Sequence, residues 1–345
     1  MRVPVKEVVV EGARLPRVLP LVKGNKKAAM HPTAPQALRA RKAPPLKGIA
    51  QVPGDKSISQ RALILAAMAA GESRISGLLE SEDVLNTAAS LRALGAEVTR
   101  QADGTWRVKG AVWNSPAAPL DFGNSGTGSR LVMGAVAGMN ITATFTGDAS
   151  LRSRPMARVL DPLKPFGATY EGQGVKALMP VTLHGAGAAV AQDVVVHVAS
   201  AQVKSALLLA AVSARGTSHV TQPVLTRDHT EKMLTAFGAA ITVTPNGQGG
   251  ETISVLGPAQ LMATEVEVPR DPSSAAFALV AALIVPGSEI SLPAILLNPR
   301  RTGLIETLLE MGTDISIANR RLKYLDTVGT TIENDFRRYH PSGHG

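Results

Sequence analysis

Four short runs of apolar residues stand out along this chain, and each follows a group of small polar residues. The runs cover residues 62–70, 131–138, 206–212 and 275–283. They have almost no polar face at helical spacing, and helices that are apolar all round are buried. The Ser, Thr and Asp residues before them are typical helix N-caps. The pattern predicts four buried helices that each start from a polar cap.

A second element recurs behind each of these helices. It is a helical pattern that ends in Gly, the usual residue just past a helix C-terminus, and short alternating strands such as 97–99 and 241–243 follow it. The endings recur about every 72 residues, at Gly95, Gly167, Gly238 and Gly312. Such a period indicates a structural repeat. We therefore predict an α+β fold with at least four copies of one unit and with buried helices.

The first polar group, GDKSISQR at residues 54–61, is also a candidate anion site. The N–H groups at the start of a helix lack partners and attract negative charge, and here an ammonium, hydroxyls and a guanidinium join them. Alternatively, Ser57 or Ser59 only caps the helix and Arg61 is solvated. The recurrence of polar caps favours the first interpretation, so we expect a phosphorylated or carboxylated small molecule to bind.

Composition narrows the candidate chemistry further. The chain has no cysteine, which excludes disulfides, thiolate metal sites and a Cys nucleophile. Its histidines form no cluster with ligand spacing, so we expect no metal. No apolar run reaches the length of about 18 residues that spans a bilayer, so we expect a soluble protein without a membrane partner.

The net charge of +9 is concentrated near the N-terminus. Residues 1–45 hold ten Lys and Arg against Glu7 and Glu11, whereas the other residues hold 26 basic and 25 acidic side chains. A nearly neutral body with 3% aromatic residues argues against nucleic-acid binding. We predict that residues 1–48 form a basic, proline-containing, disordered leader, with Met30 as a plausible native start.

Five segments, in order along the chain, carry a resemblance to a known family. They are PGDKSISQRA (53–62), FGNSGTG (122–128), GDASLRSRPM (147–156), SAQVKSA (200–206) and TRDHTEK (226–232). The chain resembles the 5-enolpyruvylshikimate-3-phosphate synthase family from about Leu46 to about Ala318. It looks closest to the bacterial class with reduced glyphosate sensitivity. The resemblance implies an inside-out α/β barrel, in which six units form two three-unit domains around a cleft.

The resemblance also implies a reaction and a set of site residues. Members of the family transfer the enolpyruvyl group of phosphoenolpyruvate to the 5-hydroxyl of shikimate 3-phosphate and release phosphate. The residues implied for shikimate 3-phosphate are Lys56, Ser57, Arg61, Ser200, Ala201, Gln202 and Arg227. Those implied for phosphoenolpyruvate are Lys56, Gly126, Arg154 and Gln202. Glyphosate would be an inhibitor, no cofactor would be needed, and the protein would be a cytoplasmic monomer.

Some of these residues also have simpler interpretations. Arg227 could be a solvated charge at a helix start, and Gly126 could be a turn glycine. We interpret Arg152, Lys204 and Lys232 as surface charges.

The chain departs from the family pattern at two places. Gly126 stands where this bacterial class often has alanine, which predicts greater glyphosate sensitivity than is usual for the class. We expect residues 56–268 to form a complete three-unit domain, residues 49–55 and 269–318 to form part of the other domain, and residues 319–345 to be a tail that does not match the family. The family's acid and base, an Asp and a Glu, would then lie in a missing segment, and we expect a truncated, inactive or impaired enzyme.

The division into one complete and one partial domain leads to an expectation about exposed apolar residues. A half-built second domain would leave apolar side chains uncovered along one helix, at Leu304, Ile305, Leu308 and Leu309.

Two other functions also stay open. One is the related UDP-N-acetylglucosamine enolpyruvyl transferase, whose usual cysteine acid is absent here, and the other is a non-catalytic fragment that binds shikimate 3-phosphate.

Overall fold

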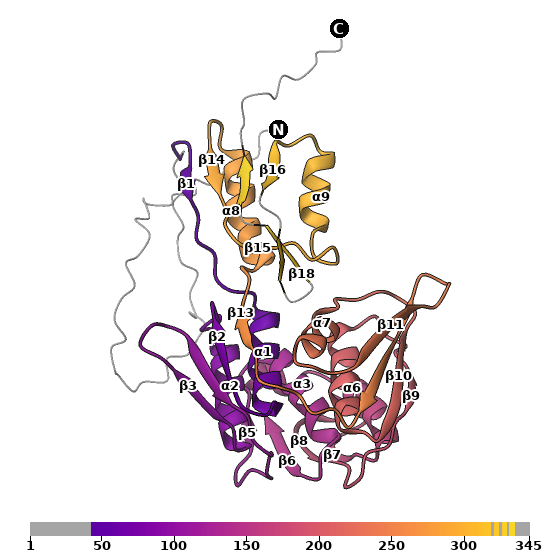
Figure 1. Ribbon diagram of the computed structural model, residues 1–345. Helices are drawn as coiled ribbons and strands as arrows, with labels where there is room; N and C mark the ends of the chain where they lie inside the picture. Colours follow the sequence, from indigo (N-terminus) through magenta and orange to yellow (C-terminus); the bar gives the residue numbers. More distant parts are fainter. Residues whose placement is uncertain (1–42, 319–320, 324–325, 330, 335–345) are drawn as a thin grey trace, which may run out of the picture.

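The computed structural model describes residues 43–318, 321–323, 326–329 and 331–334. These residues form a larger part, 56–268, and a smaller part that comprises 43–55 and the described residues after 268 (Figure 1). Residues 1–42 of the predicted leader lie outside the described residues. Its predicted end at residue 48 was wrong, because Lys47 and Gly48 belong to a strand, Lys47–Ile49, that pairs with Glu289–Ser291. Among the described residues, no helix is long and apolar enough to cross a membrane.

Three repeated units make up the larger part, and each has a four-stranded sheet. The sheets have the strand orders β13-β2-β4-β3, β5-β6-β8-β7 and β9-β10-β12-β11. In every sheet the first strand pairs in parallel with its neighbour and the other pairs are antiparallel. The shared topology confirms the repeat that the sequence predicts.

The strands of these sheets are short and alternate along the chain with the helices. In the first sheet they are β13 (Glu265–Glu267), β2 (Glu72–Ser76), β4 (Trp106–Lys109) and β3 (Glu97–Arg100). In the second they are β5 (Leu120–Asp121), β6 (Thr142–Thr146), β8 (Leu178–His184) and β7 (Thr169–Gln173). In the third they are β9 (Asp193–Val195), β10 (Gly216–Gln222), β12 (Glu251–Gly257) and β11 (Ile241–Pro245).

The first helix of each unit is buried, as its apolar sequence predicts. These helices are α1 (Lys56–Met68), α3 (Gly126–Ala137) and α6 (Ala201–Ser213). Helices α3 and α6 pack so closely that a Cβ on Gly134 would lie 2.3 Å from the carbonyl oxygen of Ala206. Together the three helices form the centre of the larger hydrophobic core.

The second helical element of each unit ends at one of the recurring glycines. These elements are α2 (Glu82–Ala93), the 3-10 helix η1 (Asp161–Phe166) with the short α4 (Ala149–Arg152) and α5 (Ala157–Leu160) before it, and α7 (His229–Ala236). The repeated glycines have positive φ, from 83° to 112°, which confirms the predicted helix endings. In the second unit this element is not a regular α-helix, because Pro165 inside it removes an N–H donor.

The smaller part contains a fourth copy of the same unit. Its sheet has the order β1-β14-β19-β16, with the same pattern of one parallel and two antiparallel pairs. Its elements are β1 (Lys47–Ile49), α8 (Pro272–Ile284), β14 (Glu289–Ser291), α9 (Gly303–Glu310), β16 (Ile315–Ala318) and β19 (Thr331–Asn334). A second sheet joins β15 (Ile295–Leu296), β18 (Asp326–Gly329) and β17 (Arg321–Lys323). Strand β19 is the fourth strand of the unit, so this unit extends beyond Ala318.

Burial in the smaller part differs from the sequence expectation. Helix α8 buries Ala275, Leu279 and Ala282, but Phe277 is 83% exposed and Ile284 is 72% exposed. The prediction of a helix buried on all sides was therefore wrong for this copy, because only one face of α8 packs against its sheet. On α9, Leu304 and Leu309 are exposed as expected, but Ile305 and Leu308 are buried in the smaller core.

Two strand-like crossovers connect the parts and run antiparallel beside each other (Figure 1). The amide of Asp55 donates to the carbonyl of Pro269 at 2.8 Å, and the amide of Asp271 donates to the carbonyl of Pro53 at 2.9 Å. The two crossovers lead directly into α1 and α8. They therefore bring two of the four polar caps to one place.

Candidate functional site

A cavity of about 560 Å³ lies where the two crossovers meet the larger part. Residues at the N-termini of α1, α3, α6 and α8 all line it, so the four polar caps of the sequence pattern converge on one space. Aligned helix N-termini favour an anion. The cavity also receives four cations, Lys56, Arg61, Arg227 and Arg301, against the carboxylates of Asp55 and Asp271.

All seven residues that the resemblance implies for shikimate 3-phosphate line this cavity. They are Lys56, Ser57, Arg61, Ser200, Ala201, Gln202 and Arg227. They come from the starts of α1 and α6 and from the loop before α7. The structure thus gathers residues that are up to about 170 positions apart in the chain.

The cap of α1 determines how Lys56 and Ser57 enter the cavity. Asp55 is buried and accepts a hydrogen bond from the amide of Ile58 at 2.8 Å, which fixes the first turn. Lys56 is half exposed, and its Nζ lies 3.1 Å from Asp83. An exposed pair of this kind contributes little, so Lys56 is available to an anionic ligand.

Arg61 forms the inner wall of the cavity and is only 3% exposed. Its guanidinium donates to the carbonyl and hydroxyl oxygens of Ser57 and to the hydroxyls of Ser205 and Thr230. Burial lowers the pKa of Arg61 to about 10 against the opposing charges of Glu231 and Asp55, so it stays protonated at neutral pH. The interpretation of Arg61 as a solvated charge was therefore wrong.

Gln202 is held in one orientation by two neighbours. Arg130 donates to its Oε1 at 2.5 Å, and its Nε2 donates to the hydroxyl of Thr127 at 2.8 Å. Beside it, Ser200 caps α6 through the amide of Val203. Arg130 was not among the site residues predicted from the sequence.

Gly126 and Arg154 do not line this cavity but lie next to it, near Arg130, which contacts Gln202. A Cβ on Gly126 would lie 2.9 Å from Nη1 of Arg154 and 3.6 Å from Nη1 of Arg130. Arg154 donates to Asn124 and Ser150. Burial, together with repulsion from Arg158 and Arg154, lowers the pKa of Arg130 to about 10. This corner therefore concentrates positive charge beside the Gln202 side chain.

Arg227 is exposed in the cavity and makes no hydrogen bond or ion pair with the residues that the structure describes. Burial and repulsion from Arg301 lower its pKa, against the charges of Asp55 and Asp271. Arg301, which the sequence analysis missed, lies 3.1 Å from each of these two carboxylates. It ties together the caps of α1 and α8.

A family model with the description EPSP synthase (3-phosphoshikimate 1-carboxyvinyltransferase) matches residues 40–337 of this chain. The chain belongs to the EPSP synthase family. The match extends past Ala318, where we expected the resemblance to end, in agreement with β19 as the last strand of the fourth unit.

Individual relatives agree with the family match. The 3-phosphoshikimate 1-carboxyvinyltransferase of Afipia carboxidovorans is 55% identical over 315 residues, which is 88% of this chain and 71% of that protein. The protein of the same name from Methylorubrum populi is 52% identical over 86% of this chain and 67% of its own length. These names favour the shikimate transferase over the UDP-N-acetylglucosamine enzyme.

A solved structure confirms the predicted fold class. EPSP synthase from Acinetobacter baumannii superimposes with a TM-score of 0.77 at 39% identity, over 84% of this chain and 64% of that one. The α+β fold of the enolpyruvyl transferase type is therefore established for this chain. The chain spans about two thirds of the length of these relatives.

Of the three expected surface charges in this EPSP synthase family chain, one was assigned wrongly. Lys204 is fully buried in α6, and its Nζ lies 2.5 Å from Oε1 of the buried Glu231. Lys232 is partly buried and pairs with Asp228 at 3.1 Å, whereas Arg152 is exposed as expected. Lys204 belongs to the polar segment before the apolar run 206–212, so the sequence pattern did not indicate its burial.

The ion pairs beside the cavity predict an acid-sensitive fold. Burial alone would raise the pKa of Glu251, but the hydrogen bonds and charge of Arg300, with Gln222 and Lys204, hold that pKa below its ordinary value of 4.5. The stabilisation is therefore complete above about pH 5 and is lost as the pH falls through the lowered pKa. We expect Glu251→Gln to reduce the free energy of unfolding at pH 7 and to reduce it less at pH 3.

Urea denaturation of both proteins at a series of pH values measures this difference. The exposed carboxylate Glu97 provides a control, because Glu97→Gln should change stability by less than about 1 kcal/mol throughout. A Glu251→Gln effect that stays constant from pH 7 to pH 3 would contradict the assignment.

Proposed function

We propose that the cavity binds shikimate 3-phosphate and that the chain takes part in the reaction named for its relatives, 3-phosphoshikimate 1-carboxyvinyl transfer. The observation that carries the proposal is the convergence of four helix N-termini with Lys56, Arg227 and Arg301 on one cavity. The phosphate would meet the hydroxyl of Ser200, the first N–H groups of α6 and the guanidinium of Arg227. Charge-assisted hydrogen bonds of this kind are the strongest that a phosphate makes.

The second substrate would occupy the positive corner behind Gln202. Phosphoenolpyruvate carries a carboxylate and a phosphate, and Arg154 offers a planar guanidinium that matches either group. Gly126 leaves room there, and Lys56 would touch both substrates. The enolpyruvyl group would then face the 5-hydroxyl of shikimate 3-phosphate, and binding both reactants in one cleft would supply the proximity that the transfer requires.

Proton transfer is the part of the reaction that the described cavity does not provide for. Its lining carboxylates are Asp55 and Asp271, and both are paired with Arg301. A carboxylate held by a guanidinium is a poor base, because the positive charge lowers its pKa. General acid–base catalysis typically raises a reaction rate by about 10²–10⁴-fold, so its absence would slow the transfer strongly. We expect the 345-residue chain by itself to bind shikimate 3-phosphate and to release phosphate from the two substrates at no more than a trace rate.

Calorimetric titration of the full chain with shikimate 3-phosphate and, separately, with UDP-N-acetylglucosamine tests the binding proposal. We expect saturable 1:1 binding of the first and none of the second at the same concentrations. Preference for the UDP-sugar would contradict the proposal. A phosphate-release assay on the same preparation tests the expected lack of turnover, and a rate typical of an enzyme would overturn that expectation.

Gly126 provides a prediction about the inhibitor. We propose that glyphosate binds in the corner between Gly126 and Arg154 and that the glycine makes this chain more sensitive than its tolerant relatives. In Gly126→Ala the new Cβ would lie 2.9 Å from Nη1 of Arg154 and crowd that corner. We expect glyphosate binding in the presence of shikimate 3-phosphate to weaken at least tenfold, which corresponds to about 1.4 kcal/mol.

The matched control is Gly303→Ala, because Gly303 has no atom within 4 Å of its added Cβ and lies at the start of α9. Titration of glyphosate into each protein measures the effect. Equal affinities of the wild type and Gly126→Ala would contradict the assignment. We also propose that the chain is monomeric, which sedimentation velocity measures on the same samples.

A further inference from the structure

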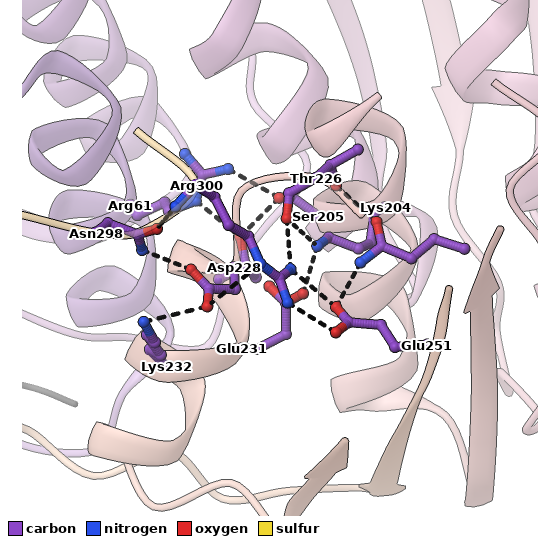
Figure 2. A network of polar contacts seen from close by, with 12 residues as sticks. Arg61, Lys204, Ser205, Thr226, Asp228, Glu231, Lys232, Glu251, Asn298 and Arg300 are labelled. Atoms are coloured by element: carbon purple, nitrogen blue, oxygen red, sulfur yellow. Dashed lines mark hydrogen bonds and ion pairs between the residues drawn. The ribbon is translucent and has the colours of Figure 1, made fainter. Parts of the chain in front are cut away.

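The loop that carries Arg227 is anchored on both sides of that residue by the smaller part of the molecule. Nη1 of Arg300 donates to the carbonyl oxygen of Thr226 at 2.5 Å. Nδ2 of Asn298 donates to Oδ1 of Asp228 at 2.6 Å. Figure 2 shows these contacts meeting between the two parts. Arg227 therefore lies between two residues that the smaller part holds, Thr226 through its carbonyl and Asp228 through its side chain.

Arg300 is itself fixed by the larger part. Its Nη1 and Nη2 donate to the two carboxylate oxygens of Glu251 at 2.9 and 2.8 Å, and its Nε lies 3.9 Å from Oδ2 of Asp228 (Figure 2). A bidentate pair of this kind fixes the orientation of the guanidinium and also strengthens the interaction. Glu251 is 6% exposed, so water competes little for this pair.

A second set of contacts, all with the larger part, holds the same loop. Nζ of Lys204 lies 3.5 Å from the carbonyl oxygen of Thr226, and the hydroxyl of Thr226 donates to Oε1 of Gln222 at 2.7 Å. The amide of Gln222 donates in turn to Glu251 at 2.5 Å. The carbonyl of Thr226 thus faces two cations, Lys204 from the larger part and Arg300 from the smaller part.

We propose that Arg300, assisted by Asn298, is a positioning residue for the cavity arginine Arg227. The proposal rests on the proposed function, since it assigns Arg227 a phosphate ligand. Arg300 does not line the cavity. It acts by holding the carbonyl of Thr226 and, with Asn298, the carboxylate of Asp228, so the residues on either side of Arg227 stay in the binding conformation. Without Arg300 the loop would lose its contact with the smaller part at Thr226 and would be less ordered before the phosphate binds. The entropy of ordering the loop on binding would then weaken the affinity.

This role differs from a general contribution to stability. A structural role would lower the affinity for shikimate 3-phosphate whether or not the Arg227 guanidinium is present. A positioning role requires that guanidinium, so the effect of losing Arg300 should disappear when Arg227 is already truncated. A double-mutant cycle separates the two roles.

The test uses calorimetric titration of the full chain with shikimate 3-phosphate. The proteins are the wild type, Arg300→Ala, Arg227→Ala and the double variant. We expect Arg300→Ala to weaken binding about tenfold in the wild-type background and less than twofold in the Arg227→Ala background. Arg107→Ala is the control, because Arg107 also donates to a carboxylate, Glu72, but is half exposed on a sheet of the larger part. It should leave the affinity unchanged.

Equal losses in the two backgrounds would overturn the positioning role and leave the proposed function intact. Absence of binding by the wild type would overturn both. If Arg300→Ala does not fold, the cycle is run with Asn298→Ala and with Arg300→Lys, whose ammonium cannot pair with Glu251 through two N–H donors and contact Thr226 in the same geometry. We expect these variants to lose less affinity for shikimate 3-phosphate, and to lose it only when Arg227 is present. An equal loss of affinity with and without Arg227 would contradict the proposal.

Discussion

Arg227→Ala is expected to weaken the binding of shikimate 3-phosphate by about 30-fold to 100-fold, or roughly 2–3 kcal/mol. Arg227 lines the cavity and makes no hydrogen bond or ion pair with the described residues, so its donors are available to a ligand. We place the loss toward the low end of the range for charged partners because the side chain is partly solvated. Titration calorimetry measures it directly.

Arg227→Lys should recover only part of this affinity, because an ammonium cannot make the paired hydrogen bonds of a guanidinium to phosphate. The control Arg107→Ala should bind like the wild type. An Arg227→Ala protein that binds shikimate 3-phosphate with unchanged affinity would show that Arg227 is only a solvated charge at the start of α7. That simpler interpretation was left open by the sequence.

Lys204→Met is expected to lower the free energy of unfolding by about 3–5 kcal/mol. The substitution removes the ammonium that lies 2.5 Å from Glu231, so that buried carboxylate loses its ion-pair partner and keeps the charges of Arg61 and Arg300. Burial lowers the pKa of Lys204, while the charge and hydrogen bond of Glu231 oppose the shift, as expected for a buried pair. Urea denaturation at neutral pH measures the loss.

The double variant Lys204→Met with Glu231→Leu should recover much of this stability, because buried ion pairs replaced by apolar residues are often neutral or stabilising. Lys109→Met is the matched control, since its exposed pair with Glu97 should contribute no more than about 1 kcal/mol. A Lys204→Met protein as stable as this control would show that the pair does not bear on folding.

The elements of the fold that could be predicted from sequence are those with a local cause. Polar caps followed by apolar runs located α1, α3 and α6, and the glycines at Gly95, Gly167, Gly238 and Gly312 marked helix endings because each requires a positive φ. Their period then predicted the repeat. The boundary near Ala318 could not be found in this way, because β19 is assigned to the fourth unit by pairing with β14 and β16.

The binding residues that a sequence motif contains could be predicted. The residues that position them could not. Arg301 contacts Asp55 across 246 positions, and Arg300 reaches Glu251 across 49. No periodic or local signal in the sequence joins such pairs. Lys204 was interpreted as a surface charge because its partner, Glu231, lies on another helix, α7. Only the packing of α6 against α7 shows that both are buried.

A crystal structure of the full 345-residue chain with shikimate 3-phosphate bound tests the central claim most directly. We expect the phosphate to lie in the cavity between the starts of α1 and α6, with its oxygens within about 3 Å of the Ser200 hydroxyl and the Arg227 guanidinium. We also expect Arg300 to keep its contacts with Glu251 and Thr226. A phosphate bound elsewhere, with Ser200 and Arg227 in contact with water alone, would show that this cavity is not the binding site for shikimate 3-phosphate.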